Sequence, residues 1–143
     1  MNRPTRIRLC AIILVLLAAL FLAVCRQRTK ADEHVTEKDI GGKTYIWEKE
    51  GFGGDFAIAL YDDGTFEYYE GGLSSYIGSG KWSLDKGVVT LDEDDSGYGF
   101  SFRFAVRSGD LVYLSEGSDT FIYTDVKDGD HFTPSEKHGI FSE

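Results

Sequence analysis

Cysteine is nearly absent from this sequence, and so is helical periodicity. The two cysteines, Cys10 and Cys25, lie in or beside an N-terminal hydrophobic segment, so the rest of the chain has none. This excludes a disulfide framework, a thiolate metal site and a cysteine nucleophile in the folded part. The missing helical period excludes an α/β fold, which would need helices between its strands. A domain stabilised by its hydrophobic core alone is the consistent interpretation.

Positive charge is scarce after residue 30. Residues 1–30 hold six basic residues and no acidic one, and residues 31–143 hold the other 9 Lys and Arg against all 24 Asp and Glu, a balance of −15. A surface of this charge repels phosphates, so we expect no nucleic-acid partner. A cationic partner is more compatible with the negative electrostatic field of this domain. The alternative is that the acidic residues serve only to keep the protein soluble.

The long hydrophobic run of the chain is its N-terminal segment, residues 9–24, which has no charged residue. Three interpretations compete: an uncleaved membrane anchor, slightly short of a straight span; a lipoprotein signal with Cys25 as the acylated residue; and a cleaved secretory signal. Val24 and Arg26 are both unusual beside a lipidated cysteine. All three interpretations place residues 31–143 outside the cytoplasm. We expect the domain to lie at the cell membrane, held by a single-pass or lipid anchor.

Four regions follow along the chain. Residues 1–25 form the signal anchor or lipoprotein signal, residues 26–41 a solvated polar tether, residues 42–132 the folded domain and residues 133–143 a flexible tail. Short β-rich runs separated by Gly and Asp predict eight strands within the domain. They span residues 43–50, 55–62, 65–70, 80–85, 88–93, 99–107, 111–116 and 119–126.

Alternation within these runs predicts strands buried on one face. Phe100, Phe102, Phe104 and Val106 share a face, as do Phe56, Ile58 and Leu60, and as do Trp82 and Leu84. Gly-containing turns at residues 62–65, 85–87 and 108–110 join successive strands as hairpins. An antiparallel meander of eight strands escapes exposed edges by closing. We therefore predict an all-β fold, a small closed lipocalin-like barrel with a mostly filled core.

Hairpin order places the three tight turns at one end of the barrel and the longer connections at the other. The longer connections carry apolar and hydroxyl side chains among glycines, which is typical of binding loops on a rigid scaffold. The alternative is that Leu73, Tyr76 and Ile77 fold back and plug the barrel. The candidate binding residues are Phe52, Leu73, Ser74, Ser75, Tyr76 and Tyr98.

Motifs for catalysis or cofactors are missing from the sequence. The glycine-rich residues 71–80 lack the Lys-Ser/Thr of a phosphate loop, and there is no G-x-S-x-G nucleophile motif. The acidic residues 92–95 and 125–130 lack the ligand order of a calcium loop. His34, His131 and His138 have no metal-ligand spacing. We therefore expect no enzyme activity, cofactor or metal.

A family resemblance is carried by residues 45–48, 54–56, 63–66, 68–71, 74–78 and 80–82 (YIWE, GDF, DGTF, YYEG, SSYIG and GKW). Over about residues 45–132 the chain resembles uncharacterised small domains of Firmicutes gut bacteria. These occur as short membrane-anchored proteins and as the extracytoplasmic end of membrane metallopeptidases similar to beta-lactamase regulators. The resemblance implies no catalytic residues, and the metallopeptidase His-Glu motif is missing here. The overall strand pattern is similar to that of lipocalin-like barrels, but this sequence lacks the N-terminal Gly-x-Trp motif of true lipocalins.

Three functions remain as hypotheses. The first is a non-enzymatic, membrane-tethered binding or sensing module that engages a protein or small-molecule partner through the loops. The second is a lipocalin-like carrier of one small apolar ligand, and the third, ranked lowest, is a cell-surface enzyme or enzyme inhibitor.

Overall fold

The computed structural model describes residues 13, 16, 31–48, 55–72, 74–94 and 97–136. The chain divides into two compact units, Met1–Lys30 and Ala31–Glu143, and the fold described below is that of the second. Within the described residues, no helix has the length and apolar character needed to cross a membrane. Cys25 and the predicted membrane segment, apart from residues 13 and 16, lie outside the described residues.

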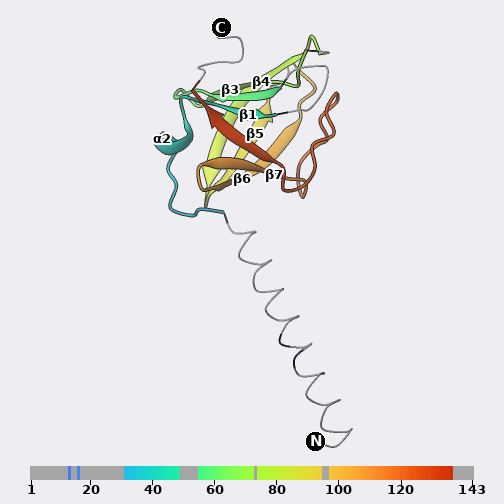
Figure 1. The fold of residues 1–143 in the computed structure, drawn as a ribbon. Coiled ribbons are helices and arrows are strands. Elements are labelled where there is room, and N and C mark those ends of the chain that lie inside the picture. The colour runs from blue at the N-terminus through green and yellow to red at the C-terminus, as the bar shows by residue number, and fades with distance from the viewer. Residues whose placement is uncertain are drawn as a thin grey trace, which may run out of the picture. The chain divides into compact units, whose positions relative to one another are not determined.

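Eight antiparallel strands form a closed barrel in which each strand pairs with its neighbours in sequence and β8 pairs with β1 (Figure 1). The predicted all-β barrel is therefore confirmed. The strands are β1 (Lys43–Trp47), β2 (Phe56–Leu60), β3 (Thr65–Tyr69), β4 (Ile77–Asp85), β5 (Val88–Glu93), β6 (Ser101–Arg107), β7 (Asp110–Leu114) and β8 (His131–Ser135).

The predicted position of the eighth strand was wrong. Residues 119–126 are not a strand, and β8 lies at His131–Ser135, partly in the predicted flexible tail. Its register pairs Tyr45 with Pro134 and Leu111 with Phe132. Phe132 is fully buried, and this apolar anchor explains how a polar segment containing proline closes the barrel.

The tight-turn end of the barrel is covered by residues 31–41, which the sequence predicted to be a solvated tether. They include a short helix, α2 (Glu37–Ile40), whose last residue is buried. The Tyr45 hydroxyl donates to the Ile40 carbonyl at 3.2 Å. Asp32 donates its backbone N–H to the Val106 carbonyl, and its carboxylate accepts from the Ser108 N–H, both at 2.8 Å. Ile40 thus gives this segment an apolar anchor in the core.

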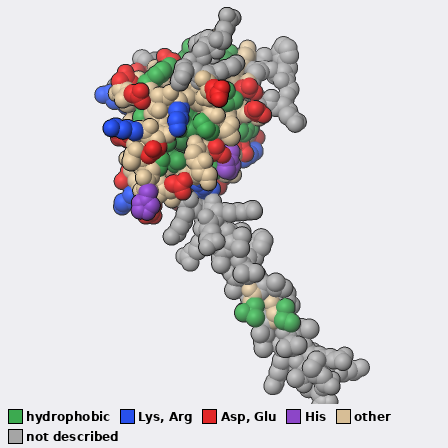
Figure 2. Space-filling view, turned by 60° about the vertical axis from the view of Figure 1, so that its left-hand side comes forward, with side chains coloured by type: hydrophobic (Ala, Val, Ile, Leu, Met, Phe, Trp, Pro, Cys, Tyr) green, Lys and Arg blue, Asp and Glu red, His purple; other side chains and the backbone are tan. Residues whose placement is uncertain are grey.

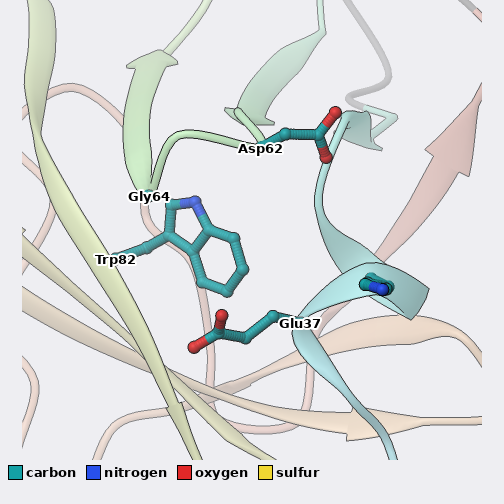
Figure 3. Close-up of a pocket in the computed structure, with 5 residues that line it drawn as sticks. Glu37, Asp62, Gly64 and Trp82 are labelled. Atoms are coloured by element: carbon teal, nitrogen blue, oxygen red, sulfur yellow. The ribbon is translucent and has the colours of Figure 1, made fainter.

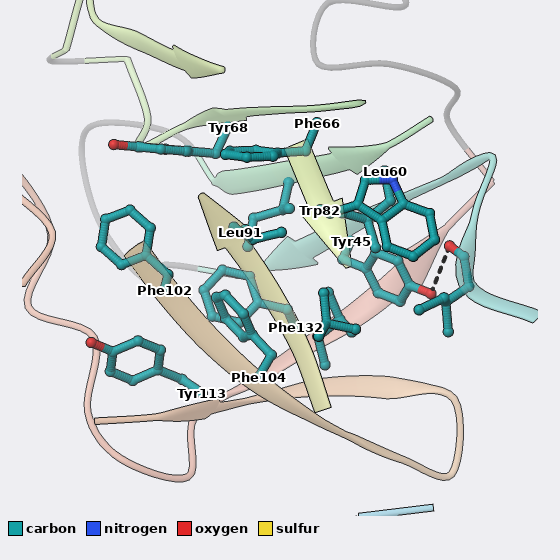
Figure 4. Close-up of a cluster of buried hydrophobic side chains, with 14 of the residues drawn as sticks. Tyr45, Leu60, Phe66, Tyr68, Trp82, Leu91, Phe102, Phe104, Tyr113 and Phe132 are labelled. Carbon is teal, nitrogen blue, oxygen red and sulfur yellow. Dashed lines mark hydrogen bonds between the residues drawn. The ribbon is translucent and has the colours of Figure 1, made fainter. Parts of the chain in front are cut away.

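The barrel interior is filled by side chains (Figure 4). The predicted inward positions of β2, β4 and β6 are confirmed, since Phe56, Ile58, Leu60, Phe102, Phe104 and Val106 are fully buried and Trp82 is nearly so. Buried aromatic rings contact one another throughout, for example Phe104 edge-on to Phe132 with centroids 5.4 Å apart. The core therefore consists mainly of packed aromatic rings, which bury large areas and favour such edge-on geometry.

Candidate functional site

The two ends of the barrel differ in their connections. The turn end has three connections of two to four residues, 61–64, 86–87 and 108–109, whereas the loop end has connections 48–55, 70–76, 94–100 and 115–130. The predicted division into short turns and longer loops is confirmed. The last loop is longer than predicted, because β8 begins at His131.

Large hydrophobic side chains that remain exposed within described residues 31–136 all belong to the loop end. They are Ile77 (41% exposed), Tyr98 (59%), Ile122 (42%) and Tyr123 (50%), and we call this set the loop-end surface. Ile77 pairs with Tyr69 in the β3–β4 ladder. Tyr98 contacts Tyr76, the residue before Ile77, with ring centroids 5.1 Å apart. Ile77 and Tyr98 therefore lie on elements that contact each other, and Ile122 and Tyr123 are adjacent residues of one loop at the same end.

Glu93, at the end of β5, organises one side of this surface from within. Its Oε1 accepts hydrogen bonds from the hydroxyls of Tyr68 and Tyr76, both at 2.8 Å. Its Oε2 accepts from the backbone N–H groups of Tyr98 at 3.0 Å and Phe100 at 3.2 Å. A buried carboxylate needs such compensation for its lost hydration. The four bonds hold the β5–β6 loop, and with it exposed Tyr98, against the barrel.

The two phenols stay protonated donors at neutral pH. Burial, followed by the hydrogen bond to Glu93, raises the pKa of Tyr76 to about 12. The same two causes, in the same order, raise the pKa of the fully buried Tyr68 well above its usual range. Removing a proton from either phenol would place a second negative charge beside Glu93. Glu93 and the two phenols therefore serve to hold the β5–β6 loop and Tyr98 in place.

Gly78 makes this arrangement sterically possible. It faces Tyr68 across the β3–β4 ladder, and a Cβ atom built on it would lie 2.0 Å from Tyr68 Cε1 and 2.5 Å from Glu93 Oε1. Only a residue without a side chain lets the tyrosine ring lie flat against the strand. Gly78, which lies in a glycine-rich segment predicted to be a loop, is therefore needed for the packing of β4.

Glu70 holds the other side of the loop-end surface. Its carboxylate accepts from the backbone N–H groups of Tyr123 at 2.7 Å and Ile122 at 3.3 Å, and its carbonyl accepts from the Thr124 hydroxyl at 3.1 Å. Burial raises the pKa of Glu70 above 4.5, and these hydrogen bonds oppose that increase. Glu70 therefore fixes the two large exposed hydrophobic residues of the β7–β8 loop, Ile122 and Tyr123, next to β3.

Phe121, from the same loop, closes the loop end of the barrel. Its ring stacks on Phe102 with centroids 3.9 Å apart and meets Phe56 edge-on at 4.8 Å. The sequence had offered Leu73, Tyr76 and Ile77 as candidate plugs, whereas Phe121 was assigned to a strand. Ile77 is exposed and Tyr76 is partly buried.

The predicted binding residues divide into three groups. Tyr98 is exposed at the loop-end surface and Tyr76 supports it. Ser75 is exposed, whereas Ser74 is buried, its hydroxyl accepting from the Tyr76 N–H at 3.0 Å in a local turn. Phe52 and Leu73 lie outside the described residues. Ile122 and Tyr123 were missed, because an exposed side chain in a loop gives no sequence signal when the loop is taken for a strand.

Among the described residues, no three His, Cys, Asp or Glu side chains gather to hold a metal ion. Comparison with known proteins gave no match to a family model, a curated protein or a solved structure.

Proposed function

We propose that residues 31–143 form a non-enzymatic, membrane-tethered extracytoplasmic module that binds a protein partner through the loop-end surface. One observation carries this proposal: large exposed hydrophobic side chains of the described domain are confined to one end of the barrel. Exposed apolar groups that cluster on a soluble surface mark interaction sites. Tyrosine is moreover a residue type that often dominates binding energy.

The loop-end surface is also held rigidly, which favours binding. Glu93 fixes the loop carrying Tyr98, and Glu70 fixes the loop carrying Ile122 and Tyr123. A surface ordered before binding loses little conformational entropy when the partner docks. The filled interior favours this surface over an enclosed ligand, since buried aromatic side chains already occupy the barrel.

The chemistry of the partner follows from the charges beside these hydrophobic groups. The β7–β8 loop carries Glu116, Asp119, Asp125, Asp128 and Asp130, against the single basic Lys127. A loop that combines acidic side chains with exposed apolar ones is complementary to a basic surface with apolar or aromatic side chains. We therefore expect a partner of that kind, bound more weakly as ionic strength rises.

Site-specific photocrosslinking in the native host tests this proposal. A benzophenone amino acid replaces Tyr98 or Tyr123 in the full chain, and Asp85 at the turn end serves as the matched control position. We expect one partner to crosslink from both loop-end positions and not from Asp85. Introducing Tyr123→Ser into the chain crosslinked at position 98 should reduce that product, because one apolar contact is lost.

The proposal fails if the crosslinked product forms equally well from Asp85, or if no protein crosslinks from either loop-end position. It also fails if Tyr123→Ser leaves the crosslink from position 98 at full yield. Thermal unfolding of each variant shows that the barrel is intact.

A further inference from the structure

A concave site lies at the turn end, at the opposite end of the barrel strands from the loop-end surface. It is a pocket of about 460 Å³ lined by Glu37, Lys38, Asp62, Gly64 and Trp82 (Figure 3). α2 provides one wall and the β2–β3 turn the other. Its volume is within the range of pockets that hold small ligands.

Trp82 contributes an aromatic ring to this pocket, and its indole N–H is already used in a hydrogen bond within the protein. Its indole N–H donates to the Tyr61 carbonyl at 2.9 Å, and its backbone N–H donates to the Gly64 carbonyl at 2.9 Å. These bonds fix the ring, and the single polar group of the indole is satisfied. What Trp82 can offer a ligand is therefore its π system, of which only a small part is accessible because the residue is 8% exposed.

Two exposed residues, Glu37 and Asp62, place carboxylates beside the indole. Figure 3 shows the side chains of Glu37 and Asp62 on opposite sides of the Trp82 ring. Among the described residues, neither carboxylate makes a hydrogen bond or ion pair. Two carboxylates close to them in sequence do have partners: Asp39 accepts a hydrogen bond from Thr36, and Asp63 accepts one from Thr65. These hydrogen bonds lower the pKa of Asp39 and of Asp63.

We propose that this pocket binds an organic ammonium group between the two carboxylates and the Trp82 ring. A cation near the face of tryptophan is attracted by the ring quadrupole, and flanking carboxylates add direct Coulomb attraction. The charge balance of −15 in residues 31–143 raises the local concentration of cations around the domain. Trp82 is only 8% exposed, so a stacked sugar, which needs a broad ring face, is disfavoured relative to a compact ammonium group.

Lys38 contributes the opposite charge to the same pocket. It is exposed on α2 and lines the pocket. Under this proposal its ammonium would compete with a ligand cation for the two carboxylates. Replacing Lys38 with a neutral side chain should therefore strengthen ligand binding, whereas a simple apolar pocket would not respond in this direction.

The test follows the indole N–H signal of Trp82 by NMR in the full chain, held in a micelle of non-ionic maltoside detergent. The chain has two tryptophans, and Trp47→Phe assigns the two indole signals. Choline is titrated as the small free ammonium, Nα-acetyl-lysine methylamide as an ammonium presented on a peptide, and 3,3-dimethyl-1-butanol as the neutral isostere of choline. We expect saturable shifts of the Trp82 signal with either or both cations and none with the alcohol. The tighter cation indicates whether a free amine or a lysine side chain is the natural ligand.

Charge-neutral variants locate the binding. Glu37→Gln should weaken binding of the preferred cation roughly fivefold, as expected for the loss of one ion-pair contact near a surface. Glu33→Gln is the matched control, because it removes the same charge from the same segment outside the pocket and should change affinity little. Lys38→Gln should tighten binding.

The proposal is overturned if neither cation shifts the Trp82 signal, or if the neutral alcohol shifts it equally. Equal weakening by Glu33→Gln and Glu37→Gln would also overturn it, since the effect would then belong to the field of the whole domain. The loop-end surface is untouched by these variants, so the outcome is independent of the proposed function.

Discussion

Glu93 and Glu67 accept hydrogen bonds from tyrosines on opposite sides of the barrel wall. Glu67, on the outer side, accepts from the Tyr61 hydroxyl at 2.8 Å, where water can replace either partner. Glu93, inside the loop end, is the shared acceptor of the Tyr68 and Tyr76 hydroxyls and two backbone N–H groups. The same residue type therefore has a different energetic role at each position.

Glu93→Ala should lower the free energy of unfolding by about 3 kcal/mol or more, because it leaves buried donors without an acceptor. Glu93→Gln should cost less, since its amide oxygen retains one acceptor. Urea unfolding of the purified chain in non-ionic detergent measures both. Glu67→Ala is the matched control, with an expected cost of about 1 kcal/mol or less. Equal losses at the two positions would contradict the central role of Glu93.

At the scale of strands and loops, the hairpin order of the first seven strands follows from alternation and Gly-containing turns. β5 (Val88–Glu93) begins and ends as predicted, since its apolar alternation and flanking turns agree. The last strand could not be found this way. Residues 119–126 are rich in β-formers, whereas His131–Ser135 has Pro134 and one buried residue, Phe132. The hydrogen bonds of Glu70 and the burial of Phe121 override local propensity there.

The candidate site was predictable only in part for the same reason. Tyr76 and Tyr98 follow from hairpin order, because the sequence places their loops at one end. Ile122 and Tyr123 depend on Glu70, which is distant in sequence and looks like an ordinary surface carboxylate until the fold buries it. Long-range hydrogen bonds of this kind leave no periodic signal.

Because Glu70 is buried beneath the β7–β8 loop, the free energy of unfolding should depend on whether Glu70 is ionised. Burial raises the folded pKa of Glu70 above the unfolded value of 4.5, so the folded state binds this proton more tightly than the unfolded chain does. The stability that Glu70 contributes is therefore complete below pH 4.5 and is lost as the pH rises through the folded pKa. The advantage of the parent chain over Glu70→Gln should shrink from pH 4 to pH 7.

Urea unfolding of both chains across this pH range measures that difference. Glu116→Gln, at an exposed carboxylate of the same loop, is the control and should show no comparable trend. A difference that stays constant, or grows in favour of the parent chain as the pH rises, would contradict a raised pKa for Glu70.

For the whole molecule, charge and surface chemistry are both unevenly distributed. The six basic residues of 1–30 flank the hydrophobic segment on both sides, and the domain that follows has a balance of −15. Asp and Glu side chains are spread over the face of the domain in Figure 2. Within the described part of this domain, the large exposed hydrophobic side chains instead lie at the loop end. Acidity therefore acts as a general field, whereas the loop-end surface and the Trp82 pocket offer distinct local chemistry.

Membrane orientation is the prediction that joins these features. The positive-inside rule gives no direction, since basic residues lie equally on both sides of residues 9–24. A single hydrophobic segment ahead of the acidic domain instead predicts export of residues 31–143.

Asp85→Cys places a thiol at an exposed strand end of a domain that has no cysteine. A membrane-impermeant maleimide should label this variant in intact cells and leave the parent chain unlabelled, because Cys10 and Cys25 lie in or beside the hydrophobic segment. Labelling only after lysis would place the domain in the cytoplasm and would remove the basis for an extracytoplasmic partner.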